Sequence, residues 1–210
     1  MDTNKHLGFT IKIKQDCCSA NPRTEWDNLA HLWCWHKRYD LGDEKPSWAE
    51  HWFDTADTGD SIYDEIEEEF RPVVIEPLSL LDHSGLTLYK GHGAHQCDPG
   101  GWDSGPIGLA FISRKDALKE HNCKYITKRI RGFCQKVLDA EIETYDMALR
   151  GDVWGYIITA SDGKEVDSCW GFYGYDYCLE EAKSMVDTLA PAHQVEIIEE
   201  MRKSGPVIIP

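Results

Sequence analysis

The stretch "VWGYIITASDGKEVDSCWGFY", residues 153–173, contains the clearest hairpin signal in the chain. Two runs rich in aromatic and β-branched residues, 153–160 and 164–173, are separated by Ser161, Asp162 and Gly163. Aspartate and glycine tolerate the backbone angles of a tight reversal, so this composition favours two antiparallel strands. The stretch therefore predicts a β-hairpin.

Further strands are predicted on both sides of this hairpin. "VVIEPLSLL" (73–81) and "LTLY" (86–89) flank a turn that begins at Asp82, which predicts a second hairpin. Strict alternation of apolar and polar residues in "LGFTIKIK" (7–14) predicts a half-buried strand, and "IGLAFISR" (107–114) predicts another. Residues 29–39 are ambiguous. Their aromatic content favours a strand with Trp33 and Trp35 on one face and Leu32 and Cys34 on the other.

Helices are predicted between and after these strands. Ile62, Ile66 and Phe70 give a helical stripe over 61–70, with Asp60 or Ser61 as the N-cap. Ser113 is placed to cap a short helix over 114–121, and a long helix is expected over 124–149, ending near Gly151. Residues 178–190 form an amphipathic pattern, and 195–201 suit either a second helix or a strand.

This order of elements predicts an α+β fold, with helices packed on a mainly antiparallel sheet that contains two β-hairpins. The chain shows no internal repeat and no Pro- or Ser-rich linker, so we expect a single domain over 1–210. Within it we expect an irregular acidic segment at 40–70 and a loose C-terminal tail at 204–210.

The formal charge of −15 is unevenly distributed. Residues 40–76 carry a net charge of −11 and residues 139–200 a net charge of −12, whereas residues 114–136 carry +6. Acidic surfaces repel a phosphate backbone, so direct nucleic-acid binding is not expected, except through the basic segment 114–136. A protein with a basic surface is the expected partner. A homodimer in which the basic segment 114–136 meets an acidic block is also compatible with this pattern.

No apolar run resembles a signal peptide or a membrane span, which predicts a cytoplasmic protein that does not enter a membrane. Eight cysteines occur without a C-x-x-C pair, and in a reducing cytosol we expect them to be free thiols.

Residues 82–105 combine three histidines, a cysteine and three aspartates with several glycines. His92, His95 and Cys97 have the spacing H-x-x-H-x-C, and His83 is a further candidate ligand for a metal such as zinc. The second ligand pair of a structural zinc module is missing, so we expect no cofactor, with a divalent metal as the alternative. Turn chemistry explains the Asp, Ser and Gly residues more simply.

Two sets of candidate site residues emerge. The first is an acidic ribbon along and before the helix at 61–70, formed by Asp54, Asp57, Asp60, Asp64, Glu65, Glu67, Glu68 and Glu69. Acids three or four residues apart on a helix lie about 5–6 Å apart, a spacing within a factor of two of the phosphate step of DNA. The second is a polar pocket formed by Asp82, His83, Asp103, Tyr145 and Asp167.

Five blocks resemble an uncharacterised family of small proteins encoded by tailed phages and related mobile elements. They are "PRTEWDNLAHLWCWHKRYDLGDE", "LLDHSGLTL", "WDSGPIGLAFISR", "EIETYDMALRGDVWGYII" and "DSCWGFYG", between residues 22 and 174. The resemblance implies a phage or mobile-element origin and no particular activity. By analogy with inhibitors that phages direct against host defences, it suggests an anti-restriction or anti-CRISPR-like role.

Two hypotheses follow. In the first, the chain is a non-enzymatic inhibitor that binds a host nucleic-acid-handling defence protein through the acidic ribbon, as a nucleic-acid mimic. In the second, it is a small enzyme or ligand-binding protein that uses the polar pocket, with or without a divalent metal.

Overall fold

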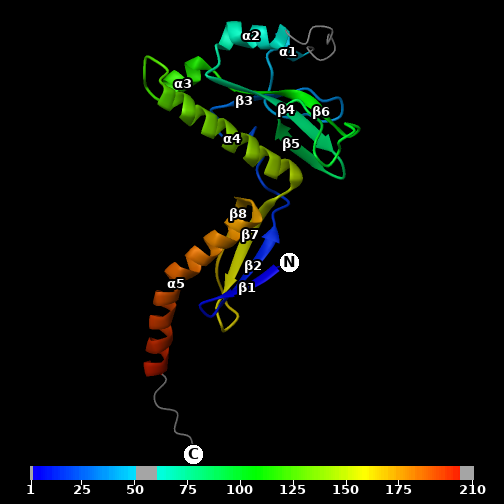
Figure 1. Ribbon diagram of the computed structural model, residues 1–210. Coiled ribbons are helices and arrows are strands. Elements are labelled where there is room, and N and C mark those ends of the chain that lie inside the picture. Colours follow the sequence, from blue (N-terminus) through cyan, green and yellow to red (C-terminus); the bar gives the residue numbers. More distant parts are fainter. Residues whose placement is uncertain (1, 51–60, 204–210) are drawn as a thin grey trace, which may run out of the picture. The chain divides into compact units, whose positions relative to one another are not determined.

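The computed structural model describes residues 2–50 and 61–203, and within it the chain forms two compact units (Figure 1). Unit 1 comprises Met1–Ser19 and Gly151–Pro210, and unit 2 comprises Ala20–Arg150. The described residues of each unit contain one four-stranded antiparallel sheet, with one helix packed on it in unit 1 and several in unit 2, which confirms the predicted α+β class and both predicted hairpins. The expectation of a single domain over 1–210 predicts that these two units unfold together.

The sheet of unit 1 has the strand order β1-β2-β7-β8. Its strands are β1 (Asp2–His6), β2 (Phe9–Gln15), β7 (Val153–Thr159) and β8 (Glu165–Tyr173). The turn between β1 and β2 consists of Leu7 and Gly8, both with positive φ, as in the tight turns that suit the twist of a hairpin. The prediction placed Leu7 inside a strand and missed β1, whose polar sequence lacks alternation.

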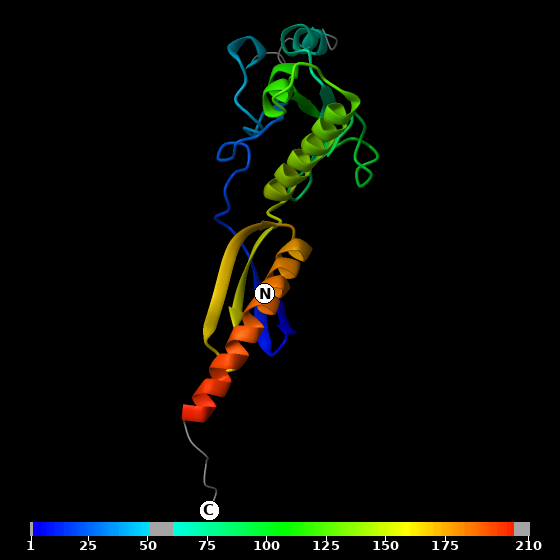
Figure 2. The ribbon, with the colours of Figure 1, turned by 90° about the vertical axis from the view of Figure 1, so that its left-hand side faces the viewer.

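Helix α5 (Tyr175–Lys203) covers one face of this sheet (Figure 2). Phe9, Ile11 and Ile13 of β2 are buried there, against Ala182 and Val186 of the helix. The two segments predicted at 178–190 and 195–201 form this one helix, which continues through Pro191.

The sheet of unit 2 has the strand order β3-β6-β4-β5. Its strands are β3 (His31–Cys34), β6 (Ser104–Ile112), β4 (Val74–Asp82) and β5 (Leu86–Lys90). The described residues of the same unit also form four helices: α1 (Ser47–Glu50), α2 (Ser61–Phe70), α3 (Arg114–Glu120) and α4 (Lys128–Arg150). Helix α4 begins four residues later than expected and ends at Arg150, just before Gly151, which has a φ of +67°. Ser113 caps α3 as expected by accepting a hydrogen bond from the backbone N–H of Asp116.

Helices cover both faces of the sheet of unit 2 (Figure 1). On one face Leu32 and Cys34 pack in a cluster with residues of α4, and on the other Trp33 and Trp35 pack with residues of α1 and α2. The alternation predicted for this segment is therefore confirmed, although the strand itself is shorter than 29–39.

Candidate functional site

Helix α2 presents the acidic ribbon to solvent because its apolar residues are fixed on the other side. Ile62 and Ile66 are 1% and 0% exposed and pack in the cluster around Phe111. This orientation leaves five carboxylates exposed: Asp64, Glu65, Glu67, Glu68 and Glu69. Asp54, Asp57 and Asp60, the other members predicted for the ribbon, lie outside the described residues. The five described ones form the surface that we call the α2 acidic face.

The charge of the α2 acidic face is not neutralised by ion pairs within residues 2–50 and 61–203. None of its five carboxylates lies within 4.0 Å of a described lysine, arginine or histidine nitrogen. Within the described residues, no lysine or arginine of the segment 114–136 forms an ion pair with a carboxylate. One of these residues, Arg131, donates a hydrogen bond to the backbone carbonyl of Val73. Five like charges on ten residues therefore remain available to a cationic partner.

A hollow of about 420 Å³ opens beside the α2 acidic face. Glu65, Glu68 and Glu69 line it together with Trp48 of α1. The indole of Trp48 is 40% exposed and lies edge-on to Trp33, at 5.7 Å between ring centroids, which holds it in place. Carboxylates around an aromatic ring can bind a guanidinium or ammonium group by ion pairing and by the cation–π interaction.

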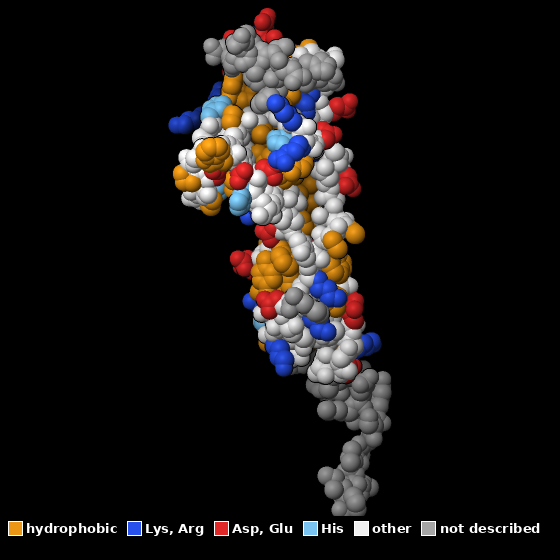
Figure 3. Space-filling model, turned by 90° about the vertical axis from the view of Figure 1, so that its right-hand side faces the viewer, with side chains coloured by type: hydrophobic (Ala, Val, Ile, Leu, Met, Phe, Trp, Pro, Cys, Tyr) orange, Lys and Arg blue, Asp and Glu red, His pale blue; other side chains and the backbone are white. Residues whose placement is uncertain are grey.

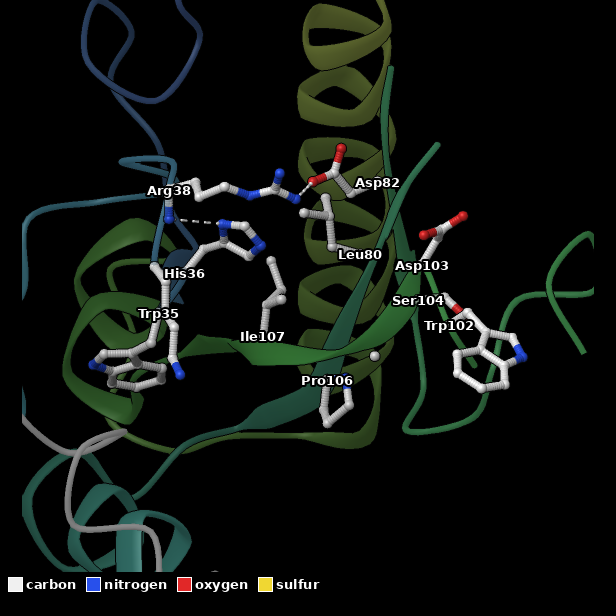
Figure 4. A pocket seen from close by; sticks show the side chains of 12 residues that line it. Trp35, His36, Arg38, Leu80, Asp82, Trp102, Asp103, Ser104, Pro106 and Ile107 are labelled. Carbon is white, nitrogen blue, oxygen red and sulfur yellow. Dashed lines mark hydrogen bonds and ion pairs between the residues drawn. The ribbon is translucent and has the colours of Figure 1, made fainter. Parts of the chain in front are cut away.

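A second hollow, of about 460 Å³, lies where β4 and β6 meet the segment after β3 (Figure 4). Asp82 and Asp103 line it on one side, and His36, Lys37 and Arg38 line it on the other. Arg38 forms an ion pair with Asp82 across the hollow, as the figure shows.

The structure brings together three of the five residues predicted for the polar pocket, Asp82, His83 and Asp103. The backbone N–H of Asp82 donates to the carbonyl of Asp103, and the Nδ1 atom of His83 lies 2.8 Å from a carboxylate oxygen of Asp103. Tyr145 instead lies buried in α4, where its hydroxyl oxygen accepts a hydrogen bond from the N–H of Gly42, and burial raises the pKa of Tyr145 to about 12. Asp167 belongs to unit 1, where it accepts a hydrogen bond from the hydroxyl of Tyr156.

The histidines of the Gly-rich stretch contact different partners. His92 lies 3.1 Å from the hydroxyl of Tyr63, and His95 lies edge-on to Tyr89 while its ring accepts a hydrogen bond from the N–H of Cys97. In the described part of the chain no three His, Cys, Asp or Glu side chains are grouped as metal ligands. Asp98 instead organises this loop, and its hydrogen bond from Ser104 lowers the pKa of the Asp98 carboxyl.

A buried charge network surrounds Arg23, which is not among the candidate site residues predicted from the sequence. The Arg23 side chain is 1% exposed and binds both Asp43, at 2.7 Å, and Glu141, at 2.8 Å. Burial alone would lower the pKa of Arg23, but the hydrogen bonds that its guanidinium donates to Asp43 and Glu141, together with the negative charges of these two carboxylates, outweigh burial and leave the pKa raised. The carboxylate of Glu141 also accepts hydrogen bonds from the N–H groups of Leu29 and Ala30. The network ties the segment before β3 to α4, so its role is structural.

Compared with protein-family models, curated proteins and solved structures, the chain gives no match. None of the described helices is long and apolar enough to cross a membrane. The fold and the surfaces together define an α+β protein of two antiparallel sheets that carries an exposed acidic helix in unit 2.

Proposed function

We propose that this chain is an acidic accessory protein of phage or mobile-element origin, which acts in the host cytoplasm. It binds and inhibits a host defence protein that handles nucleic acid, and the α2 acidic face is its contact surface. The observation that carries the proposal is the exposure of the five carboxylates of α2 without ion pairs to the described residues.

The geometry of α2 supports recognition of a surface built to bind phosphates. Asp64 and Glu68, and likewise Glu65 and Glu69, are four residues apart, so each pair lies about 5–6 Å apart along the helix. Rows of negative charge at this spacing attract lysine and arginine side chains arranged for a nucleic-acid backbone. Long-range attraction of this kind speeds association and weakens with salt.

Trp48 supplies the apolar anchor that such an acidic surface needs. Charge alone gives fast but weak association, whereas binding energy in protein interfaces is concentrated in a few aromatic or arginine contacts at the centre. The hollow between Trp48 and the carboxylates of Glu65, Glu68 and Glu69 has room for one arginine side chain of the partner.

Charge neutralisation of α2 tests this proposal. The variant Asp64→Asn, Glu65→Gln, Glu68→Gln and Glu69→Gln removes four charges from the α2 acidic face. A matched control removes four exposed charges elsewhere: Glu143→Gln, Asp176→Asn, Glu180→Gln and Glu181→Gln. Binding of an octa-arginine peptide is measured by calorimetry at low and at physiological salt, followed by capture of partners from host lysate.

We expect the α2 variant to weaken peptide binding at least ten-fold and the control to change it less than three-fold. Trp48→Ala should weaken binding with little change in the salt dependence, because it removes a contact but no charge. Equal weakening by the control variant would mean that net charge alone attracts the peptide, and the proposal would then be wrong.

A second candidate function rests on the hollow beside Asp82 and Asp103. Its volume of about 460 Å³ lies in the range of small-molecule sites, and it brings two carboxylates close to His36 and Arg38. This arrangement supports a small ligand-binding protein or enzyme, with or without a divalent metal. Elemental analysis of the purified protein and of His83→Ala tests it: a stoichiometric ion that the variant loses would favour this function over inhibition.

A further inference from the structure

The strand register of unit 1 shows which side chains lie on the sheet face turned away from α5. Residues that pair directly in an antiparallel sheet lie on the same face, and successive residues of a strand alternate between faces. Because Ile11 and Ile13 of β2 face α5, Lys12 and Lys14 face away from it. Lys5 of β1 pairs with Thr10, and so lies on the same side as these two lysines. Across the sheet, Lys14 pairs with Gly155 and Lys12 with Ile157.

Gly155 in turn pairs with Trp170, which extends this side of the sheet to β8. We call the surface formed by Lys5, Lys12, Lys14, Gly155, Ile157 and Trp170 the open face. Figure 3 views the molecule from the side opposite to that of Figure 2, where α5 lies in front of the sheet, and it shows hydrophobic side chains on unit 1 with both basic and acidic side chains close by.

The indole of Trp170 lies across Gly155 because glycine has no side chain there. A Cβ atom at position 155 would lie 2.2 Å from Cε3 and 2.4 Å from Cδ2 of Trp170, far inside contact distance. The ring thus rests on the backbone of β7, and the side chain is still 46% exposed. A tryptophan supported on one side and exposed on the other is a surface on which a second planar ring can stack.

The charge of the open face is opposite in sign to that of the whole protein. Lys5, Lys12 and Lys14 form no ion pair with any described carboxylate, and among the described strand residues that the register places on this face Glu165 is the one acid. Lys12 and Lys14 are two residues apart on one strand, so their side chains leave the sheet about 7 Å apart. The expectation against direct nucleic-acid binding rests on the two acidic blocks 40–76 and 139–200, and Lys5, Lys12 and Lys14 lie outside both.

We propose that the open face binds single-stranded nucleic acid, with a base stacked on Trp170 and backbone phosphates held by Lys5, Lys12 and Lys14. An acidic peptide would form ion pairs with the lysines, but its carboxylates would not stack on the exposed indole. A duplex keeps its bases stacked inside, whereas a single strand can offer a base to Trp170 while its phosphates reach the lysines. This inference concerns unit 1 alone and is independent of the α2 acidic face.

Fluorescence anisotropy with labelled single-stranded oligo-dT and oligo-U of twelve nucleotides tests the proposal on the full chain. We expect binding of both at low salt, weaker binding of a duplex of equal length, and quenching of tryptophan fluorescence. Trp170→Ala should weaken binding about ten-fold or more, and Trp170→Phe should retain part of the affinity. The matched control Trp102→Ala removes a tryptophan of unit 2 that is 90% exposed, and should change nothing.

The salt dependence separates phosphate contacts from other effects. Replacing Lys12 and Lys14 by Gln should reduce the slope of log affinity against log salt by about 1.4, because each phosphate contact to a single strand contributes about 0.7. The control Lys115→Gln with Lys119→Gln, on α3, should leave the slope unchanged. Circular dichroism checks that every variant is folded.

Three results would overturn the proposal: no binding of either oligonucleotide at low salt, equal losses in test and control variants, or displacement of the oligonucleotide by poly-glutamate of equal charge with no effect of Trp170→Ala. The last result would assign the open face to acidic peptides.

Discussion

The two sheets of this protein differ in how their faces are covered. In unit 2 the strands have apolar residues on both sides, and clusters of buried residues lie on both faces, against α4 and against α2. In unit 1, β2 alternates strictly between buried Phe9, Ile11 and Ile13 and partly exposed residues, among them Lys12 and Lys14, so the cluster of buried residues described for this unit lies on the face toward α5. Antiparallel sheets commonly leave one face in contact with solvent, and an uncovered face is free to bind a partner.

Because of this difference, the residues that stabilise the fold are not the ones available for binding. In unit 2 the sheet serves as the packed support, and the exposed charge lies on a helix that packs on it through Ile62 and Ile66. In unit 1 the sheet itself carries exposed lysines and an exposed tryptophan. Substitutions in covered regions should therefore cost stability, whereas substitutions on the α2 acidic face and on the open face should affect binding alone.

The largest loss of stability is expected at Phe111, which is fully buried between the sheet of unit 2 and α2. Its ring lies 5.0 Å from Trp33 and 5.2 Å from Phe70, in edge-on contacts with both. Phe111→Ala should cost about 3–5 kcal/mol, because it removes buried apolar surface and leaves a cavity. Urea unfolding followed by fluorescence and by circular dichroism measures this loss, and a change below 1 kcal/mol would contradict complete coverage of the sheet.

The same unfolding curves test the expectation of a single domain. If units 1 and 2 unfold together, both signals shift equally in Phe111→Ala. If the units unfold separately, a second transition belongs to unit 1, and its midpoint urea concentration is the same in Phe111→Ala as in the unsubstituted protein.

The next largest effect is expected at Arg23. Arg23→Ala leaves Asp43 and Glu141 with side chains 18% and 15% exposed and without their cation, which should cost about 3 kcal/mol. Arg38→Ala is the matched control, since Arg38 also pairs with an aspartate but its side chain is 69% exposed, so that the loss should stay below about 1 kcal/mol. Equal losses in the two variants would show that the Arg23 network is not a structural tie.

A smaller effect should distinguish the two faces of β2. Ile11→Val removes one methylene from the core under α5 and should cost about 1 kcal/mol. Lys12→Thr, one residue further along the same strand, should change stability by less than about 0.5 kcal/mol, because its side chain packs against no core. Thermal unfolding of both variants measures the contrast, and a larger loss for Lys12→Thr would mean that the open face is covered.

The smallest effect is a pH dependence at Asp139, whose pKa is lowered chiefly by its hydrogen bond from Lys90. A lowered folded-state pKa adds stability above the ordinary value of 3.8, and this stability is lost as the pH falls through the folded-state pKa. Asp139→Asn should therefore be slightly less stable than the unsubstituted protein at pH 7, by well under 1 kcal/mol since the side chain is 42% exposed, and the difference should shrink as the pH falls below 3.8. Urea unfolding at neutral pH and at a series of pH values below 3.8 checks it; a difference that does not shrink with falling pH would assign the loss to packing.

The sequence predicts local structure well where side-chain period and turn chemistry agree. The alternation in β2 and β3, the cap at Ser113, the turn at Gly163 and the stripe of Ile62 and Ile66 all specify structure within a few residues, and each is found in the fold. Strand β1 was missed because "DTNKH" has no apolar alternation, and it forms a strand through its register with β2.

Long-range contacts explain what the sequence does not predict. The helical pattern around Glu141 predicts a side chain in solvent. Glu141 belongs to a buried network because it contacts Arg23, which lies 118 residues earlier in the chain. Asp82, His83 and Asp103 meet because β4 and β6 are neighbours in the sheet. Nothing in the sequence around Tyr145 indicates that this residue lies apart from them. The open face depends likewise on the pairing of β2 with β7, two strands that lie some 140 residues apart in the sequence.

The most direct test of this account measures two ligands on the same set of variants. Octa-arginine and single-stranded oligo-dT are titrated against the unsubstituted protein, the fourfold neutralised α2 variant, and Trp170→Ala combined with Lys12→Gln and Lys14→Gln. The account predicts that the α2 variant loses the peptide and keeps the oligonucleotide, and that the open-face variant does the reverse. If either variant weakens both ligands to the same extent, the two surfaces are not separate binding sites and the account is contradicted.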